Sequence, residues 1–224
     1  MTKLSRPRIG ILGGSFDPIH VGHLALGRAA CEALRLDRLL VIPTGESWQK
    51  TGKGAARTSA ADRLAMVRIA LDSRPQGDSP CRWEVDGIEV DREGPSYTVD
   101  TLRALRRRFG ETAALVLLLG SDQMHNLPTW HRWEELLDLA HIAATQRERI
   151  PLHGLPPAVE SLMAERGRDA LPDAPAGNIV LFRMPPVAVS ATALREQLAR
   201  GEMPRELLPP GVPEYIASRS LYRA

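Results

Sequence analysis

The stretch that decides the fold runs from Gly10 to His23 and reads GILGGSFDPIHVGH. The apolar run Ile9 to Leu12 is typical of a short buried strand, and the pair Gly13-Gly14 ends that strand. A pattern of apolar residues at helical spacing begins at Val21. The sequence therefore predicts a strand, a glycine-containing loop and a helix in direct succession.

Glycines between a buried strand and a helix are typical of a phosphate site. Gly13 and Gly14 would let backbone N–H groups approach phosphate oxygens. The helix from Val21 would add free N–H groups and the positive end of its dipole. The spacing is neither the Rossmann fingerprint nor a P-loop, because Gly10, Gly13 and Gly14 do not form G-x-G-x-x-G and no Gly-Lys-Ser/Thr follows.

Two histidines, His20 and His23, stand three residues apart at the predicted helix start. Residues at this spacing share a helix face, so both imidazoles can point at one phosphate. A zinc site would need a third ligand, and neither a Glu after His20 nor a second pair nearby supplies one. Structural histidines are the alternative, but the glycine pair and the Asp17-Pro18 turn favour a phosphate site.

Outward from this stretch, strand and helix patterns alternate along the chain. Strands are predicted at Ile9–Leu12, Arg38–Ile42, Trp83–Val90, Ala113–Leu119, His141–Thr145 and Ile179–Met184. Helices are predicted at Val21–Leu34, Ser59–Leu71, Tyr97–Phe109, Trp133–Leu139, Val159–Arg166, Ser190–Arg200 and Pro213–Ser218. The alternation predicts an α/β, Rossmann-like, doubly wound parallel sheet. We expect one domain over residues 1–224, with a small helical part from about 186 to 224.

Composition and charge exclude several classes of protein. The 224 residues are 43% hydrophobic and 25% charged, which excludes collagen-like and wholly disordered chains. The net charge of +2 predicts no strong binding to nucleic acid or an anionic membrane. The arginines Arg103, Arg106, Arg107 and Arg108 lie at helical spacing and are interpreted as a solvated face. No apolar stretch approaches the ~20 residues of a membrane span.

Lysine is scarce, because the 29 basic residues contain only Lys3, Lys50 and Lys53. Coding bias is the simple explanation for the many arginines. Two of the three lysines, however, lie in the long predicted loop 44–58, and long loops are often functional. Lys50, or Lys53 if the loop register differs, is therefore our candidate for a point charge on a phosphate.

The two cysteines, Cys31 and Cys81, belong to no metal or disulfide motif, so reduced thiols are expected. The segment before the first predicted strand, residues 1–8, is short and polar, so it is not interpreted as a signal peptide. Together these features predict a cytoplasmic protein.

The run GGSFDPIHVGH, from Gly13 to His23, resembles the signature of the nucleotidyltransferase superfamily that carries the H-x-G-H motif. Its members transfer a nucleotidyl group from a nucleoside triphosphate to a phosphate or similar acceptor. Further segments are similar to the bacterial nicotinate-mononucleotide adenylyltransferases. They are PSYTVDTL (95–102), GSDQM (120–124), WHRW (130–133), VSATALR (189–195) and the ending from Leu208-Pro209 to Tyr215-Ile216. The matches occur in family order and span residues 10–216.

The resemblance implies that ATP and nicotinate mononucleotide react to nicotinate adenine dinucleotide and pyrophosphate, in NAD biosynthesis. Mg²⁺ would be held by the ATP phosphates rather than by a protein cage. The catalytic residues that it implies are His20, His23, Arg195 and Lys50. The implied ATP-binding residues are Gly13, Gly14, Ser15, Phe16, His20, His23, Asp122, Ser190, Thr192 and Arg195. Those implied for nicotinate mononucleotide are Ser15, Phe16, Lys50, Tyr97, Thr98 and Trp130.

Three of the ATP-binding candidates open the last long helix. Ser190 can cap that helix, and Thr192 and Arg195 follow within about one turn. Hydroxyls, a helix N-terminus and a guanidinium together make a triphosphate clamp. Asp122 follows a central strand, where an acidic residue usually hydrogen-bonds ribose hydroxyls.

Two segments are candidates for the pyridine end of the substrate. Ser96 and Thr98 can cap the helix after them and leave backbone N–H groups for an anion. The resemblance implies that this anion is the nicotinate carboxylate, with a plain cap as the alternative. Trp130 could stack on the pyridine ring, as similar enzymes imply, with core packing as the alternative. Trp133 is expected in the core.

The sequence departs from the family pattern in three places. Residues 47–50 read SWQK instead of PPHK, Ser15 replaces a frequent Thr, and Ala191 replaces a Ser. The lysine and one hydroxyl are kept. The attacking phosphate is already ionised at neutral pH, so no strong general base is required.

Several alternatives to this function stay open. A preference for nicotinamide mononucleotide differs only by amide against carboxylate. A catalytically inactive nucleotide-binding regulator is opposed by the intact His20, His23 and Arg195. A phosphopantetheine adenylyltransferase usually has Thr where His20 stands. The sequence does not determine the oligomeric state.

Overall fold

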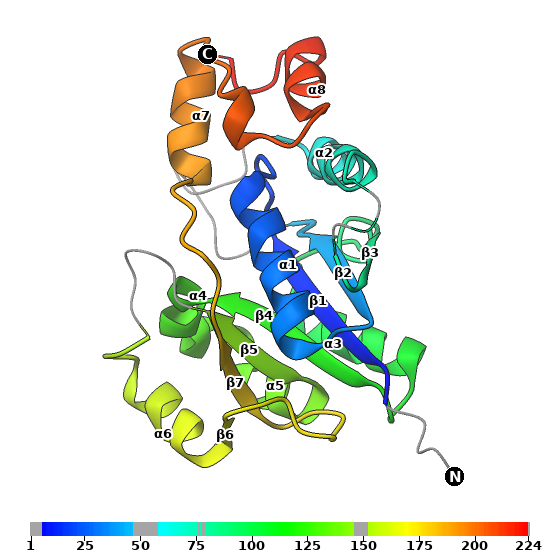
Figure 1. The fold of residues 1–224 in the computed structure, drawn as a ribbon, viewed down its shortest axis with the longest axis vertical. Helices are drawn as coiled ribbons and strands as arrows, with labels where there is room; N and C mark the ends of the chain where they lie inside the picture. The colour runs from blue at the N-terminus through cyan, green and yellow to red at the C-terminus, as the bar shows by residue number, and fades with distance from the viewer. Residues whose placement is uncertain (1–5, 47–57, 76, 78, 146–151, 224) are drawn as a thin grey trace.

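The computed structural model of the chain describes residues 6–46, 58–75, 77, 79–145 and 152–223. Within them, seven strands form one parallel sheet (Figure 1). They are β1 (Arg8–Gly14), β2 (Arg38–Pro43), β3 (Arg82–Val85), β4 (Ala114–Gly120), β5 (His141–Thr145), β6 (Gly167–Arg168) and β7 (Ile179–Phe182). Their order is β3-β2-β1-β4-β5-β7-β6, so the direction of winding reverses between β1 and β4. The predicted doubly wound fold is confirmed.

Helices cover both faces of the sheet (Figure 1). The α-helices are α1 (Val21–Leu34), α2 (Ala60–Asp72), α3 (Thr98–Phe109), α4 (Ser121–Asn126), α5 (Leu136–Leu139), α6 (Pro157–Arg166), α7 (Ala191–Ala199) and α8 (Val212–Ser218). Short 3-10 helices are η2 (Leu127–Thr129), η3 (Trp133–Glu135) and η4 (Arg205–Leu207). The helices α7 and α8 lie beyond the carboxyl ends of the strands, above the start of α1.

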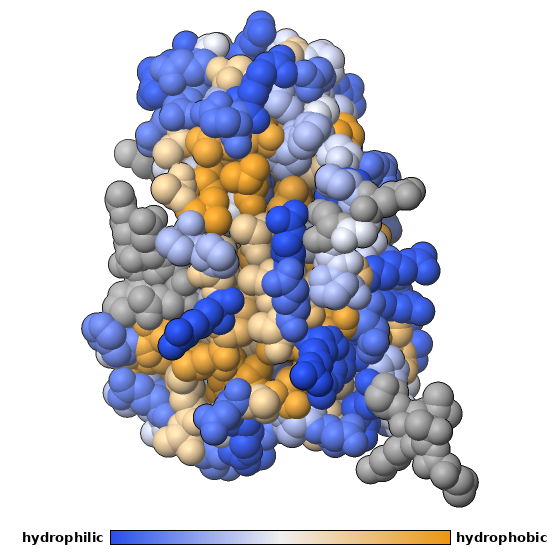
Figure 2. All heavy atoms as spheres, viewed as in Figure 1, coloured by the Kyte–Doolittle hydropathy of each residue, from blue (hydrophilic) through white to orange (hydrophobic). Residues whose placement is uncertain are grey.

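Alternation of side chains along the strands builds one core on each face of the sheet. In β2, Leu39 and Val41 pack with α1 and α2, while Leu40 and Ile42 pack with α3. Because both faces are covered, β4 and the part of β2 after Arg38 are apolar at every position rather than alternating. Figure 2 shows a band of apolar residues down the middle of the face on which α1 lies, flanked by hydrophilic residues.

The cysteines correct one prediction. Cys31 and Cys81 are joined by a disulfide, so the expectation of reduced thiols is wrong. The reason is packing between elements distant in sequence. Trp83 lies against Gly27 of α1, where a Cβ would be 2.3 Å from the indole ring. This brings the Cα atoms of the two cysteines to 5.7 Å, within the ordinary disulfide range.

The strand predicted for Trp83–Val90 ends at Val85. Asp86 turns the chain there, because its carboxylate accepts a hydrogen bond from the Ile88 N–H at 3.0 Å. Asp91 N–H then closes a second turn on the Gly87 carbonyl at 2.8 Å. The short elements β6 and α4 were not predicted.

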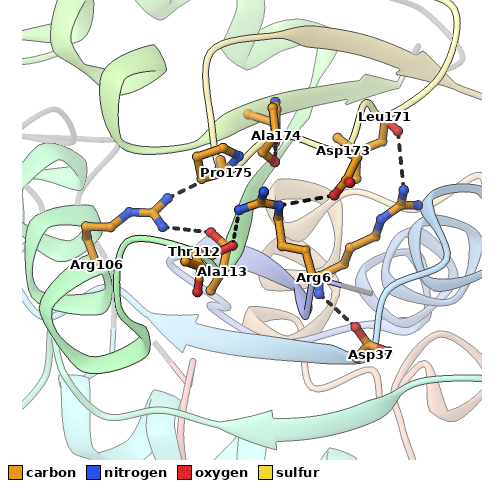
Figure 3. Close-up of polar contacts among 11 residues, drawn as sticks. Arg6, Asp37, Arg106, Thr112, Ala113, Leu171, Asp173, Ala174 and Pro175 are labelled. Carbon is orange, nitrogen blue, oxygen red and sulfur yellow. Dashed lines mark hydrogen bonds and ion pairs between the residues drawn. The ribbon is translucent and has the colours of Figure 1, made fainter. Parts of the chain in front are cut away.

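Arg106 is also not the solvated residue that its helical spacing predicted, because it is only 6% exposed. Its guanidinium donates to backbone carbonyls at the amino ends of the strands, including those of Ala113 (2.7 Å) and Pro175 (3.1 Å) (Figure 3). Arg6 donates to the Thr112 carbonyl and the Asp173 carboxylate in the same cluster. Arginine here closes the end of the sheet opposite the glycine-containing loop.

His141, at the start of β5, belongs to this same end and is fully buried. Its Nε2 lies 2.8 Å from the Ala174 carbonyl, and its Nδ1 accepts the Asn178 N–H at 3.2 Å. Since Nδ1 is an acceptor, the proton of the neutral ring is on Nε2. Burial lowers the pKa of His141, and the charges of Arg106 and Arg8 lower it further.

We expect the free energy of unfolding to decrease as the pH is lowered from about 7 to 5. In the unfolded chain His141 binds a proton near pH 6.5, whereas in the folded chain its lowered pKa keeps it neutral to a lower pH. His141 therefore lowers the free energy of unfolding by at most ~1.4 kcal/mol for each pH unit of acidification. Urea unfolding at several pH values should show a flatter dependence for His141→Gln than for the wild type. His153→Gln, at an exposed histidine, should keep the wild-type dependence. Equal slopes in all three proteins would contradict the assignment.

Candidate active site

The loop between β1 and α1 is held in a compact conformation at the carboxyl end of β1. Phe16 has a positive φ of 46° and a ring only 1% exposed. Gly14 makes room for that ring, because a Cβ at Gly14 would lie 3.3 Å from it. The following Asp17-Pro18 peptide is cis. Since the Phe16 ring is in the core, contact between Phe16 and a ligand would come from its backbone.

The two histidines lie face to face at the start of α1. Their ring centroids are 3.7 Å apart and the planes are inclined by 24°. The backbone N–H of His20 donates to His23 Nδ1 at 3.2 Å, and the ring of Phe16 packs edge-on against His23. In the neutral ring the proton of His23 is therefore on Nε2, which is a donor suited to a phosphate oxygen. The two imidazoles thus lie side by side, and their shared contact with a phosphate stays a prediction.

Gly22 provides the space for this arrangement. A Cβ there would lie 3.2 Å from His20 Cε1 and 2.7 Å from Val189 Cγ1. The glycine of the H-V-G-H sequence thus lets both the His20 ring and the segment before α7 approach α1. A segment about 170 residues further along the chain is thereby brought to the histidines.

The helix α7 brings the predicted clamp to the same place. Ser190 caps the helix, because its Oγ accepts the Ala193 N–H at 3.1 Å. Arg195 Nη2 donates to Thr192 Oγ1 at 3.2 Å, and Nη1 donates to the Asp17 carbonyl at 2.9 Å. The guanidinium is therefore fixed on the loop that leads to the histidines, and its contact with a triphosphate stays a prediction.

The sequence analysis did not identify Arg63, a buried residue of α2 that binds the loop between β1 and α1. Its guanidinium donates to the carbonyls of Ser15 (2.8 Å) and Gly45 (2.9 Å), and the residue is 3% exposed. Burial lowers its pKa, and the charge of Asp17 opposes that shift. A charged residue within the apolar face of α2 is a signal that could have revealed it.

The end of β4 supplies the second part of the candidate site. Asp122 stands in the first turn of α4, directly after β4, and its carboxylate accepts from Gln123 Nε2 at 3.0 Å. β1 and β4 are neighbours at the reversal of strand order, so Asp122, just after β4, lies at the same edge of the sheet as Gly13 near the end of β1. Its position is as predicted, and its contact with a ribose stays a prediction.

The start of α3 differs in part from its prediction. Tyr97 is the N-cap residue and Thr98 the first residue of the helix, without a side-chain cap. The Ser96 hydroxyl accepts the Gly45 N–H at 3.1 Å, so its predicted capping role is wrong. It is drawn away because residues 46 and 95 pair as an isolated bridge. The Tyr97 ring lies 4.2 Å from the ring of His131.

The remaining predicted residues have different outcomes. Trp130 and Trp133 are partly buried and pack against the core cluster that contains Leu136. Stacking of Trp130 on a pyridine ring therefore stays a prediction beside its packing role. Lys50 and Lys53 lie outside the described residues.

Among the residues that the structure describes, no three His, Cys, Asp or Glu side chains are grouped as metal ligands. Nor does any helix found there have the length and apolarity needed to cross a membrane.

Comparisons with known proteins agree with this geometry. Residues 11–197 match the family model described as cytidylyltransferase-like. The probable nicotinate-nucleotide adenylyltransferase of Dechloromonas aromatica is 41% identical over 225 residues, covering 98% of this chain and 99% of that protein. That of Laribacter hongkongensis is 43% identical over 225 residues, covering 100% and 98%.

Solved structures agree at the level of the fold. The nicotinic acid mononucleotide adenylyltransferase of Plasmodium falciparum, complexed with NaAD, matches with a TM-score of 0.73 and 18% identity. The match covers 97% of this chain and 98% of that one.

Proposed function

The chain belongs to the cytidylyltransferase-like family and, within it, to the nicotinate-nucleotide adenylyltransferases, and from this membership we infer its reaction. ATP and nicotinate mononucleotide are joined to nicotinate adenine dinucleotide, with release of pyrophosphate, as a step of NAD biosynthesis. One observation carries the assignment to this site: His20 and His23 stack at the start of α1, and Arg195 of α7 donates to the Asp17 carbonyl in the loop just before them.

The chemistry is an in-line displacement at the α-phosphorus of ATP. A phosphate oxygen of nicotinate mononucleotide forms the new P–O bond, and the bond between the α-phosphorus and the bridging oxygen to the β-phosphorus breaks. The electron pair of that bond leaves with pyrophosphate, so negative charge grows on the β-phosphate side. No proton has to be removed from the ionised nucleophile, and catalysis therefore rests on positioning and charge stabilisation.

We assign the stabilisation of that charge to three residues. His20 and His23 donate from their ring nitrogens to the α- and β-phosphate oxygens, and Arg195 adds a fixed positive charge. The stacking of the rings and the hydrogen bond from His20 N–H to His23 Nδ1 support this, since they fix the ring orientations before substrate binds. Lys50 is proposed as a further positive charge.

Around these groups, backbone and side chains would hold the two substrates. We propose that the nucleotide of ATP contacts Gly13, Gly14, Ser15, Phe16, Asp122, Ser190 and Thr192. We propose that nicotinate mononucleotide contacts Ser15, Phe16, Lys50, Tyr97, Thr98 and Trp130. The acidic Asp122 would accept hydrogen bonds from ribose hydroxyls.

Mg²⁺ fits this site as a companion of ATP. Asp17 is 2% exposed and its carboxylate already accepts hydrogen bonds from two hydroxyl groups. Asp122 is the acid that follows β4. This donor set suits an ion that keeps its waters and is bound mainly by substrate phosphates. When bound, Mg²⁺ supplies charge neutralisation of the phosphates.

The acid form of the pyridine is the expected substrate. A carboxylate at the start of the 12-residue helix α3 would meet unpaired N–H groups and the positive end of the dipole. We expect pyrophosphate release from ATP to be at least about tenfold faster, as kcat/KM, with nicotinate than with nicotinamide mononucleotide. A reversed preference would favour the nicotinamide-specific alternative. No release with either compound would favour a nucleotide-binding regulator.

Two broader proposals concern the whole chain. We propose that residues 1–224 act as one domain, because Leu194 and Ile216 belong to the same core cluster as Leu26 and Met66. We also propose a cytoplasmic location, where ATP is available. Fractionation of cells should then recover the chain with the cytoplasmic proteins, and its recovery outside that fraction would oppose this location.

A further inference from the structure

Asp17 connects the phosphate loop with parts of the chain that are far from it in sequence. Its carboxylate Oδ1 accepts hydrogen bonds from Tyr222 Oη and from Thr58 Oγ1, both at 2.7 Å. Its backbone carbonyl accepts the hydrogen bond from Arg195 Nη1. One residue between Phe16 and the cis Pro18 therefore holds the guanidinium of the clamp on one side and a tyrosine hydroxyl on the other.

Tyr222 is built into this position rather than lying against it by chance. The residue is 7% exposed and Asp17 is 2% exposed. Its φ of 65° is in the left-handed region, which a side chain of this size adopts at a cost. Burial and the charge of Asp17 together raise the pKa of Tyr222 well above its usual range, so the hydroxyl remains a donor throughout the working pH range.

We infer that Tyr222 is a positioning residue for adenylyl transfer, through its hydrogen bond to the Asp17 carboxylate; this inference rests on the proposed function. A buried carboxylate is held in place by its donors, and a hydrogen bond to a charged group is among the stronger ones in proteins. With Oδ1 fixed, the Asp17 carbonyl is fixed as well. Arg195 then meets the triphosphate in one orientation.

The simpler alternative is that Tyr222 only anchors the helical part after β7 to the rest of the molecule. The chain offers a matched control for this alternative. Tyr215 Oη donates to Asp62 Oδ1 at 2.9 Å, so this bond, like that of Tyr222, joins the part of the chain after β7 to a carboxylate that precedes β3. The Asp62 carboxylate, however, accepts the Ser59 hydroxyl at 2.6 Å and lies outside the phosphate loop.

The test compares Tyr222→Phe with Tyr215→Phe in the full chain, well below the melting temperature of each. For Tyr222→Phe we expect ATP to bind about tenfold more weakly by calorimetry and kcat to fall about tenfold. The KM for nicotinate mononucleotide should change less than twofold. Tyr215→Phe should keep all three values within about twofold of the wild type.

Several outcomes would overturn the inference. Wild-type ATP affinity and kcat in Tyr222→Phe would do so, as would equal losses in Tyr215→Phe. If Tyr222→Phe does not fold, Thr58→Val removes the other hydroxyl on the same oxygen, and its failure to weaken ATP binding would count against the role of Asp17. A wild type that binds ATP without releasing pyrophosphate would contradict the proposed function, while the ATP affinities still decide the role of Tyr222.

Discussion

Replacing His23 with Ala should lower kcat by about 10²–10³-fold, with little loss of stability. The variant removes the imidazole whose Nδ1 accepts the His20 N–H and whose Nε2 we assign to a phosphate oxygen. Donors aimed at charge that develops in a transition state contribute factors of this size. The side chain is partly exposed, so its removal opens no large cavity in the core. Pyrophosphate release under saturating substrates measures the effect.

The control is His153→Ala, which removes an exposed imidazole elsewhere on the surface. Its kcat and melting temperature should match those of the wild type. Near-normal turnover of His23→Ala would remove the catalytic role from this histidine. A large drop in melting temperature would instead show that the ring acts mainly through its packing against Phe16.

The second large effect is expected for Arg195→Ala, at about 10²-fold in kcat/KM for ATP. The guanidinium is held by Asp17 and Thr192, and charge-assisted contacts with phosphate are about twice as strong as neutral ones. Arg195→Lys should recover only part of the loss, because an ammonium cannot keep both contacts and the planar fork.

Arg200 gives the matched control for this prediction. It ends the same helix and pairs with Glu202 at 2.8 Å, on an exposed face. Arg200→Ala should change kcat/KM for ATP by less than about twofold, since exposed ion pairs contribute little. An equal loss in both variants would indicate that α7 itself, rather than the Arg195 guanidinium, is the sensitive element.

Local patterns predicted the fold because each strand and helix is decided by residues near one another. The helix from Val21 to Leu34 and the strand from His141 to Thr145 have the predicted bounds. The predictions were wrong where contacts between distant segments determine the end of a strand or the burial of a side chain. The chain turns at Asp86 although apolar residues continue to alternate. Arg106 is buried in part because it donates to the carbonyl of Pro175, which is 69 residues away.

In the candidate site, too, local patterns predicted some contacts and contacts between distant segments escaped prediction. The meeting of His20 with the segment before Arg195 could be expected, because both lie beside helix starts at the carboxyl edge of one sheet. The hydrogen bond from Tyr222 to Asp17 spans 205 residues, and neither residue carries a local pattern that indicates the other. The disulfide between Cys31 and Cys81 is a further case, since it depends on how Trp83 packs against α1.

Gly22 shows how helix stability and activity can oppose each other at a single position. It lies within α1, where alanine would be favoured over glycine by about 1 kcal/mol. The space that an alanine methyl would take is already occupied by the His20 ring and by Val189. A change that improves the helix would thus push apart the two halves of the nucleotide site. The gain in helix propensity is therefore opposed by the displacement of the His20 ring and of Val189, and glycine satisfies both requirements at this position.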